Sequence, residues 1–328
     1  MNLALMAERH VLERIFREKE KQRLLHSGLE ISWPEEHLTR EQMHIQARNA
    51  DILITSWGSP KLDASVLDAA PNLQLVLHAA GSIKPVVTPE LWERGIRISS
   101  SADALAVGVA ETALGFTIVS LKNMWNLSAS TRQGGWNEGK QQIKELYGLK
   151  AGVIGAGRAG RHYIRLLRNF QVDIYVYDPT LSADDPLHTV AKPCSLEELL
   201  RVCDVVSIHA PSIPATRHLL NADTLSLMKD DAIIINTARG TIIDEAALVN
   251  ELEKGRLFAC LDVTDPEPPD GDHPFRHLPN VILTPHIAGA VNNGLGRIGE
   301  YVLNELEQFL RGESLAGEVS PDQLGQLA

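Results

Sequence analysis

Residues 149–178 have the sequence LKAGVIGAGRAGRHYIRLLRNFQVDIYVYD, and this stretch decides the fold. An apolar run at its start predicts a β-strand, and a glycine-rich turn follows directly. After the turn, apolar residues recur at the spacing of a helix. A second apolar run predicts another strand, which ends on an acid. The stretch therefore predicts a strand–helix–strand unit, the building block of parallel α/β sheets.

The turn carries the pattern G-x-G-x-x-G, formed by Gly155, Gly157 and Gly160. The first glycine permits the tight turn, the second lets backbone amides approach a pyrophosphate, and the third lets the helix pack closely on the strand. The helix N-terminus offers partial positive charge to phosphates. Asp178 closes the second strand, where its carboxylate can accept hydrogen bonds from both hydroxyls of an adenosine ribose. The pattern favours a dinucleotide site over an ordinary βαβ turn with a solvated acid.

The composition indicates a globular protein of about two domains, since the chain has 328 residues of which 44% are hydrophobic. A net charge of −11 argues against binding to nucleic acid, so a small anionic substrate would need a local cationic site. The N-terminus MNLALMAERH lacks the pattern of a signal peptide. The most apolar later stretch, residues 107–121, carries Glu111. We therefore expect no membrane segment and a cytoplasmic location.

The cysteines are three and widely spaced, at Cys194, Cys203 and Cys260. They form no C-x-x-C pair and no Cys/His ligand spacing. Reduced buried thiols are therefore expected, with neither a disulfide nor a metal site.

The first hundred residues predict a small α/β domain. Residues 7–27 have the pattern of one charged amphipathic helix. Predicted strands and helices then alternate, which indicates a parallel sheet. The strands are expected at 29–33, 52–55, 73–78 and 96–99, and the helices at 40–49, 63–69 and 89–94.

A long apolar helix is predicted from Ala104 to Asn123, too hydrophobic for a surface element and placed to connect two domains. Residues 125–148 follow without core periodicity. Trp125 and Trp136 in this segment are either subunit contacts or local packing.

Strand–helix alternation continues after residue 178 and completes a doubly wound domain. Ser195 and Glu198 predict a capping box before a helix. Another helix is expected after Asp244 and up to Gly255. A final helix, at 293–311, is expected to return to the first domain. The predicted strands are 205–210, 232–237, 257–263 and 281–284.

Three polar residues stand just past predicted strand ends: Arg239 in NTARG, Glu267 in LDVTDPEP and His286 in TPHIAG. Open α/β sheets place their ligands at the carboxyl ends of strands. A guanidinium, a carboxylate and an imidazole there can converge on a small anion and a transferable proton. Each residue alone also fits a structural role, as a surface cation, a loop acid or a packed histidine. Together they favour a catalytic site.

The chain resembles the D-isomer-specific 2-hydroxyacid dehydrogenases over nearly its whole length. The resemblance implies a Rossmann-type nucleotide domain, residues 102–287, inserted into a flavodoxin-like α/β substrate domain made of residues 1–101 and 288–328, with the active site in the cleft between them. A homodimer is expected from the apolar helix after Ala104 and the Trp-bearing segment before Leu149, and the resemblance supports it. The motifs that carry the resemblance are VIGAGRAG, YDP, HAPSIPATRHLLN, INTARGTIIDEAAL, LDVTDPEP and TPHIAG.

The same resemblance implies the roles of the site residues. Arg239 would bind the carboxylate and carbonyl of the substrate, His286 would be the acid/base, and Glu267 would pair with His286. NAD would be the cofactor, with Asp178 on the adenosine ribose and Asp262 near the nicotinamide carboxamide. The residues implied at the cofactor are Gly155, Gly157, Arg158, Ala159, Gly160, Asp178, Ala210, Thr237, Ala238 and Asp262.

One loop departs from the family pattern. Residues 78–87 read HAAGSIKPVV, without the polar side chains that are usual there. Gly81 and Ser82 can still offer backbone amides to a substrate carboxylate. Pro266 and Ala288 are milder departures. The identity of the 2-hydroxy acid therefore stays open.

The expected activity is NAD(H)-dependent interconversion of a 2-keto acid and a D-2-hydroxy acid. One alternative is a nucleotide-sensing corepressor or scaffold of the same fold. Another is a relative that acts on formate or phosphonate, although the formate branch usually has Gln at the position of Glu267.

Overall fold

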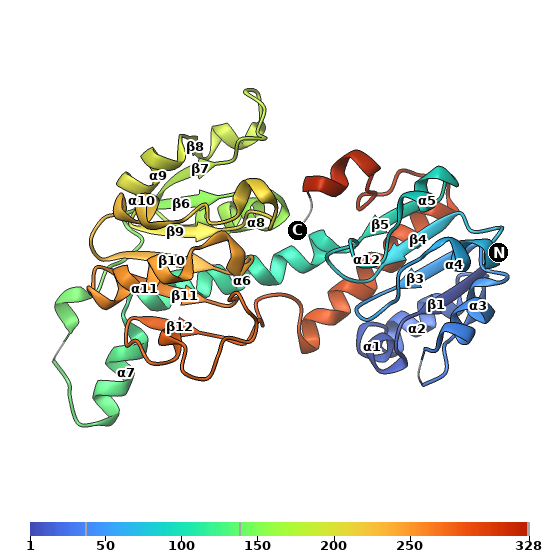
Figure 1. Ribbon diagram of the computed structural model, residues 1–328, viewed down its shortest axis with the longest axis horizontal. Helices are drawn as coiled ribbons and strands as arrows, with labels where there is room; N and C mark the ends of the chain where they lie inside the picture. The colour runs from blue at the N-terminus through green and yellow to red at the C-terminus, as the bar shows by residue number, and fades with distance from the viewer. Residues whose placement is uncertain (37, 138, 327–328) are drawn as a thin grey trace. The chain divides into compact units, whose positions relative to one another are not determined.

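The computed structural model describes residues 1–36, 38–137 and 139–326. The chain divides into two compact units, which are labelled in Figure 1 by their strands. Unit 1, with β1–β5, comprises Met1–Leu105 and the described chain from Ala290 to Gln326, and unit 2, with β6–β12, comprises Ala106–Gly289. The boundaries expected from the sequence were at 101/102 and 287/288.

Unit 1 is built on a parallel sheet with the strand order β2-β1-β3-β4-β5, the flavodoxin-like arrangement. The strands are β1 (Asn2–Met6), β2 (Glu30–Ser32), β3 (Ile52–Thr55), β4 (Leu75–His78) and β5 (Arg97–Ser100). The helices are α1 (Arg9–Ile15), α2 (Glu18–Leu25), α3 (Arg40–Ala47), α4 (Ala64–Ala69), α5 (Pro89–Glu93) and α12 (Leu295–Leu310).

Alternate residues of the unit 1 strands serve two hydrophobic cores. Leu3 and Leu5 of β1 pack with Ile298 and other residues of α12. Ala4 and Met6 of the same strand point to the opposite face and pack with residues of α3, α4 and α5. Because both faces are covered, the sheet is the middle layer of three, as Figure 1 shows.

Two features of unit 1 differ from the sequence prediction. Strand β1 was not predicted. The single helix expected over residues 7–27 is wrong, because the chain forms α1 and α2 with a break at Phe16. Helix α12 passes so close to the break that a Cβ at Gly299 would lie 2.5 Å from the Ile15 carbonyl oxygen. After the break, the Glu20 carboxylate accepts a hydrogen bond from the Arg17 amide at 3.1 Å and starts α2.

Unit 2 is built on a parallel sheet with the order β12-β11-β10-β9-β6-β7-β8. Its direction of winding reverses between β6 and β9, as in a Rossmann fold. The strands are β6 (Lys150–Ile154), β7 (Asp173–Tyr177), β8 (Lys192–Pro193), β9 (Val205–Ile208), β10 (Ala232–Asn236), β11 (Leu257–Leu261) and β12 (Val281–Leu283). The helices are α6 (Ala102–Leu121), α7 (Met124–Arg132), α8 (Arg158–Leu167), α9 (Leu196–Val202), α10 (Ala222–Ser226) and α11 (Glu245–Glu253). The α/β, doubly wound fold class expected from the sequence is confirmed.

Helix α6 is long and apolar enough to cross a membrane by length and composition alone. Its first residues belong to unit 1 and the rest to unit 2. Ala110, Ala113 and Phe116 pack in the same core as the β6 strand, and the Thr117 hydroxyl lies 2.6 Å from the Tyr163 hydroxyl. Packing in the core of unit 2 therefore accounts for the apolar composition of α6.

The capping box predicted at Ser195 forms only in part. The Ser195 hydroxyl accepts a hydrogen bond from the Glu198 amide at 3.1 Å, as an N-cap does. The Glu198 side chain does not return to Ser195, because its carboxylate instead accepts a hydrogen bond from Lys192 Nζ at 2.9 Å.

A buried histidine of unit 1 makes stability depend on pH. His78 is 2% exposed at the end of β4, and its Nδ1 lies 2.9 Å from the Thr55 hydroxyl. Burial lowers the pKa of His78 to about 4, against an opposing hydrogen bond with the Ser82 backbone. The unfolded chain therefore binds more protons than the folded chain between about pH 6.5 and pH 4, so stability falls as the pH falls through that window.

We predict that His78→Gln, which has no proton to gain, reduces the loss of stability in acid. Between pH 7 and pH 5, His78 should account for roughly 2 kcal/mol of the loss in the parent protein. The check is the free energy of unfolding in urea at both pH values for both proteins. An equal loss in the two proteins would contradict the assignment to His78.

Candidate active site

The glycine turn between β6 and α8 is shaped by two close backbone contacts. Gly155 has φ +94°, and a Cβ there would lie 2.6 Å from the amide nitrogen of Ala210. A Cβ at Gly160 would lie 2.0 Å from the carbonyl oxygen of Gly155. At Gly157, by contrast, a Cβ would have no neighbour within 4 Å. The first and third glycines are therefore required by packing, and the second leaves open space above the turn.

The acid at the end of β7 is held against this turn. Asp178 Oδ2 accepts a hydrogen bond from the Ala156 amide at 2.7 Å. Its Oδ1 accepts from the amide and the hydroxyl of Thr180, at 2.8 Å and 2.7 Å. Arg158 and Ala159 begin α8, and the first amides of a helix have no partner within it. A carboxylate and free helix amides thus flank the space at Gly157.

The other residues predicted at the cofactor lie at the carboxyl ends of neighbouring strands. Ala210 follows β9, Thr237 and Ala238 follow β10, and Asp262 follows β11. Thr237 is 5% exposed, and its buried hydroxyl has no hydrogen-bond partner among the described residues. An unsatisfied, buried hydroxyl at the carboxyl end of this sheet fits a bound dinucleotide.

The structure brings His286 and Glu267 together. His286 Nδ1 lies 2.6 Å from Glu267 Oε1, and both side chains remain accessible, at 47% and 40%. The imidazole therefore shares a hydrogen bond with a carboxylate while its other nitrogen remains available to a reactant.

His286 stands on a constrained turn that Asp262 organises. The backbone of His286 has φ +53°, an uncommon value for a residue with a side chain. Asp262 is 1% exposed, and its carboxylate accepts hydrogen bonds from the amides of Ile287 and Ala288 at 2.9 Å and 2.7 Å and from the Thr284 hydroxyl at 2.5 Å. This role of Asp262 was not predicted, because its partners lie more than twenty residues along the chain.

Arg239 lies in the loop after β10, partly buried. Its Nη1 donates to the Ala238 carbonyl oxygen at 2.6 Å. Burial lowers the pKa of Arg239, and the charge of Glu267 opposes that shift. Gly240 lets this loop pass close to the next strand end, since a Cβ there would lie 2.1 Å from the Thr264 carbonyl carbon. Arg239 and Glu267 therefore belong to one electrostatic site.

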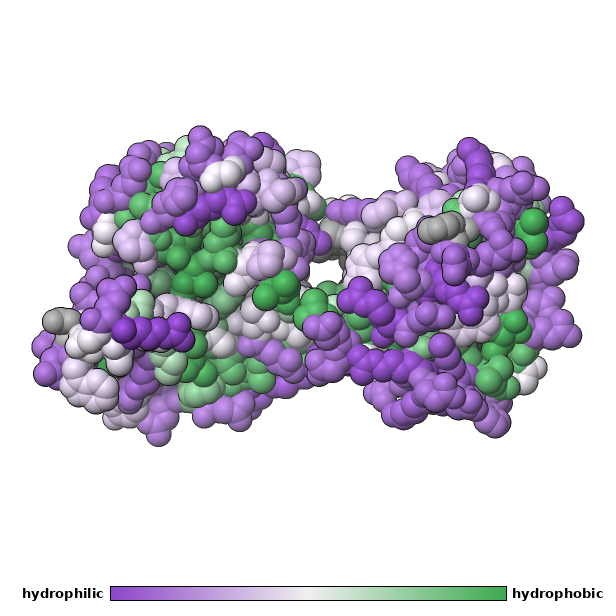
Figure 2. Space-filling view, turned by 90° about the horizontal axis from the view of Figure 1, so that it is seen from below, coloured by the Kyte–Doolittle hydropathy of each residue, from purple (hydrophilic) through white to green (hydrophobic). Residues whose placement is uncertain are grey.

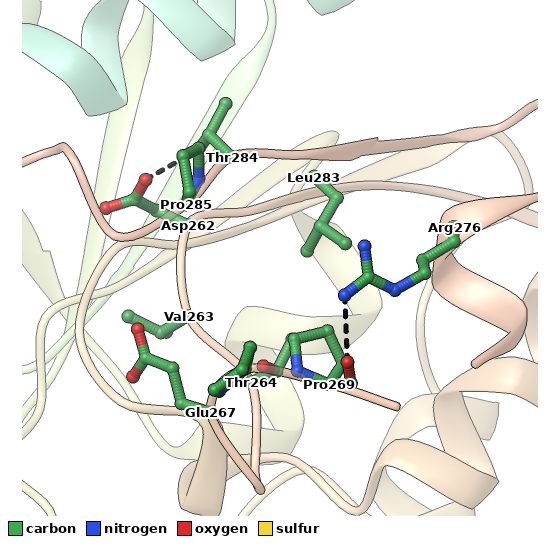
Figure 3. Close-up of a pocket in the computed structure, with 10 residues that line it drawn as sticks. Asp262, Val263, Thr264, Glu267, Pro269, Arg276, Leu283, Thr284 and Pro285 are labelled. Carbon is green, nitrogen blue, oxygen red and sulfur yellow. Dashed lines mark hydrogen bonds between the residues drawn. The ribbon is translucent and has the colours of Figure 1, made fainter. Parts of the chain in front are cut away.

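A pocket of about 380 Å³ lies beside Glu267 within unit 2, and Figure 3 shows most of its lining. Glu267 and Thr264 come from the loop after β11, and Leu283 comes from β12. The dashed lines in Figure 3 join Thr284 to Asp262 and Arg276 to Pro269.

Of the residues predicted to bind substrate, Arg239 lies in unit 2, and Gly81 and Ser82 lie in unit 1. Gly81 and Ser82 follow β4, and the Gly81 carbonyl oxygen accepts a hydrogen bond from the Ser100 hydroxyl at 2.7 Å. The ring of buried His78 is hydrogen-bonded to the Ser82 backbone. These contacts fix the course of the loop.

The glycine contacts lead to a paired prediction for dinucleotide binding. Gly157→Ala should fold as stably as the parent, because its φ of −69° suits any residue and its Cβ meets nothing. It should bind NADH about tenfold or more weakly, because the methyl group occupies the space for the pyrophosphate. Gly160→Ala should lose stability, by roughly 1–3 kcal/mol, because the backbone must move. NADH titration and thermal unfolding of both variants are the measurements, and unchanged affinity in Gly157→Ala would contradict the site.

Comparison with known proteins assigns the chain to a family. The profile of the family described as "D-isomer specific 2-hydroxyacid dehydrogenase, NAD binding domain" matches residues 114–288. D-3-phosphoglycerate dehydrogenase of Methanocaldococcus jannaschii is 32% identical over 296 residues, which are 88% of this chain and 55% of that protein. The chain thus spans about half the length of that relative.

Two further comparisons cover most of both chains. Hydroxypyruvate reductase of Thermotoga maritima is 31% identical over 286 residues, which are 86% of this chain and 92% of that protein. The crystal structure of a phosphoglycerate oxidoreductase from Rhizobium etli superposes with a TM-score of 0.84 and 26% identity, covering 98% of this chain and 99% of that one. The chain therefore belongs to the family of D-isomer-specific 2-hydroxyacid dehydrogenases, which are oxidoreductases, and its cofactor is NAD(H).

Proposed function

We propose that this protein interconverts a 2-keto acid and a D-2-hydroxy acid with NAD(H), using His286 as the acid/base. The observation that carries the proposal is the 2.6 Å contact between His286 Nδ1 and Glu267 Oε1 on the turn held by Asp262. Because Nδ1 is engaged by the carboxylate, Nε2 is left to exchange a proton with the substrate oxygen.

In the direction of reduction, charged His286 donates its Nε2 proton to the carbonyl oxygen of the keto acid. When bound, the cofactor supplies the hydride that reaches C2. Glu267 accepts the hydrogen bond from Nδ1 and so keeps Nε2 turned toward the substrate oxygen. In the direction of oxidation, neutral His286 takes the hydroxyl proton. One side chain therefore serves both directions, with opposite requirements for its charge.

Arg239 is proposed to anchor the substrate. Its planar guanidinium can grip a carboxylate and the adjacent carbonyl with two parallel hydrogen bonds. Partial burial strengthens such bonds, because water competes less for the donors. The same charge stabilises the oxyanion that develops as the hydride arrives.

The proposed substrates are small 2-keto acids. Relatives are named for phosphoglycerate and hydroxypyruvate, which differ in whether they carry a phosphate. In this chain Gly81 and Ser82 are proposed to offer amides to the substrate carboxylate. The flanking residues Ala79, Ala80 and Ile83 are apolar and buried, whereas Lys84 in the same loop carries a positive charge.

Two other functions remain as alternatives. A nucleotide-sensing scaffold of the same fold would need the glycine turn but not the His286–Glu267 pair. A formate-type or phosphonate-type relative would share most of the site, but the formate branch usually has Gln at position 267. The presence of Glu267 and its contact with His286 favour the 2-hydroxy acid reaction.

We also propose a homodimer that acts in the cytoplasm, without nucleic acid or membrane as partner. None of the residues of α7 is buried, Trp125 is 49% exposed, and Trp136 beyond the helix is 71% exposed. Figure 2 shows a broad hydrophobic area on one face of unit 2. A second copy of the chain is the proposed cover for part of this surface.

The function is tested by turnover of glyoxylate, hydroxypyruvate, pyruvate and bulkier 2-keto acids with NADH. We predict that His286→Ala lowers kcat by about 10²- to 10⁴-fold, the usual contribution of a positioned acid/base. NADH affinity should be largely retained, because the glycine turn and Asp178 are unchanged. Near-parental turnover by His286→Ala would remove the assignment, and failure of the parent with every keto acid would favour the scaffold.

Cofactor choice gives a second prediction. Asp178 accepts hydrogen bonds from two ribose hydroxyls but repels a 2′-phosphate. The parent should therefore favour NADH over NADPH by at least roughly tenfold in kcat/KM. Asp178→Asn should narrow that ratio, whereas Asp173→Asn, at the exposed start of the same strand, should leave it unchanged. Equal kcat/KM for the two cofactors in the parent would contradict the role of Asp178.

A further inference from the structure

We propose that Glu245 and His273 form a positioning pair that holds the loop of residues 264–270 and thereby keeps Glu267 against His286. The inference rests on the proposed function, because it deepens the role of the His286–Glu267 pair. Neither Glu245 nor His273 was singled out from the sequence. Both are polar, half-buried and in contact with that loop or with each other.

Glu245 contacts the loop directly. It is the first residue of α11, and its side chain is 14% exposed. Its Oε1 accepts a hydrogen bond from the Asp265 amide at 2.8 Å, two residues before Glu267. Its Oε2 lies 3.2 Å from His273 Nε2, and the His273 side chain is 18% exposed. One carboxylate therefore joins α11, the loop and the segment that follows it.

His273 ties this arrangement to the core of unit 2. Its Nδ1 accepts a hydrogen bond from the Phe275 amide at 3.3 Å, so in the neutral ring the proton lies on Nε2, facing Glu245. The His273 ring packs on Phe275 with centroids 4.6 Å apart, and Phe275 is 2% exposed in the core. The contacts thus run from the core through His273 and Glu245 to the amide of Asp265.

The other end of the loop is held by Arg276. Its Nη2 donates to the Pro269 carbonyl oxygen and its Nε to the Asp270 carbonyl oxygen, both at 2.8 Å. Figure 3 shows the first of these contacts across the pocket from Glu267. Glu267 stands between two anchored ends, and its own side chain is 40% exposed. Its place opposite His286 therefore depends on how the loop backbone is held.

The protonation state of Glu245 determines how firmly its carboxylate anchors the loop of residues 264–270. Burial and the charge of Asp265 together raise the pKa of Glu245 to about 7, against the opposing hydrogen bond from the Asp265 amide. Asp265 itself faces Arg217, at 3.9 Å. Both oxygens of Glu245 act as acceptors, so a proton on either one breaks a contact. The anchor is complete above about pH 7.

Three charged residues surround His286 and link the loop to a measurable effect. Glu267 is paired with it, Asp262 holds its turn, and Arg239 interacts with Glu267. If the loop loosens, Glu267 leaves His286, and the imidazole loses the carboxylate that fixes its orientation. Keto-acid reduction, which needs Nε2 aimed at the substrate oxygen, then slows while NADH still binds.

The experiment measures kcat for keto-acid reduction, the affinity for NADH, and the ¹⁵N NMR signals of the His286 ring, which report the hydrogen bond at Nδ1. Glu267→Gln should lower kcat by about tenfold or more and shift the Nδ1 signal, with NADH affinity kept. Glu245→Ala should change kcat and the Nδ1 signal in the same direction, and the double variant should match Glu267→Gln alone. Glu245→Gln keeps the size of the side chain but loses one of the two contacts, so it should fold like the parent and show smaller changes in the same direction.

The matched control is Glu251→Gln, a buried acid on the same helix that pairs with Lys254 and Arg256 instead of the loop. It should lower thermal stability without changing kcat or the Nδ1 signal. An unchanged kcat and Nδ1 signal in both Glu245 variants, or an additional loss in the double variant, would overturn the proposal. If the parent reduces no keto acid, the proposed function fails, and the Nδ1 signal still decides whether Glu245 positions Glu267.

Discussion

Close contact between backbone segments is the constraint on which the unit 2 site depends. At Gly155, Gly160 and Gly240 two stretches of main chain approach so closely that a Cβ would overlap the neighbouring backbone. Each contact lies just past a strand of one parallel sheet. The strand ends are thereby drawn together, and the loops that carry Asp178, Arg239 and Glu267 start from fixed positions. The packing of the main chain therefore determines where the side chains proposed for the chemistry lie.

Much of this arrangement could be predicted from the sequence, because local patterns carry it. The G-x-G-x-x-G turn is recognisable from its glycines between a predicted strand and a predicted helix. The strand ends that precede Arg239, Glu267 and His286 are predicted by apolar runs. Strand β1 was not predicted, and the reason is physical. Both of its faces are buried, so Leu3, Ala4 and Leu5 show no alternation of polar and apolar residues.

The missed features are those that depend on contacts distant in the sequence. The break at Phe16 reflects the approach of Gly299 of α12, which no local pattern records. The contact between Glu245 and His273 joins residues 28 positions apart, and each looks unremarkable where it stands in the sequence. The hydrogen bonds of Asp262 belong to the same class. Prediction from the sequence therefore found the groups proposed for chemistry more readily than those that hold them.

In the turn at His286 the backbone has a structural role and the side chain has the proposed chemical role. The amides of Ile287 and Ala288 are bound to buried Asp262, whereas the imidazole of His286 is exposed. A substitution of His286 would therefore remove the imidazole and leave the turn intact. A substitution of Asp262 would disrupt the turn and, with it, the position of the imidazole. Relatives that keep the fold only to sense nucleotides should therefore retain an aspartate at position 262 and lack the histidine at position 286.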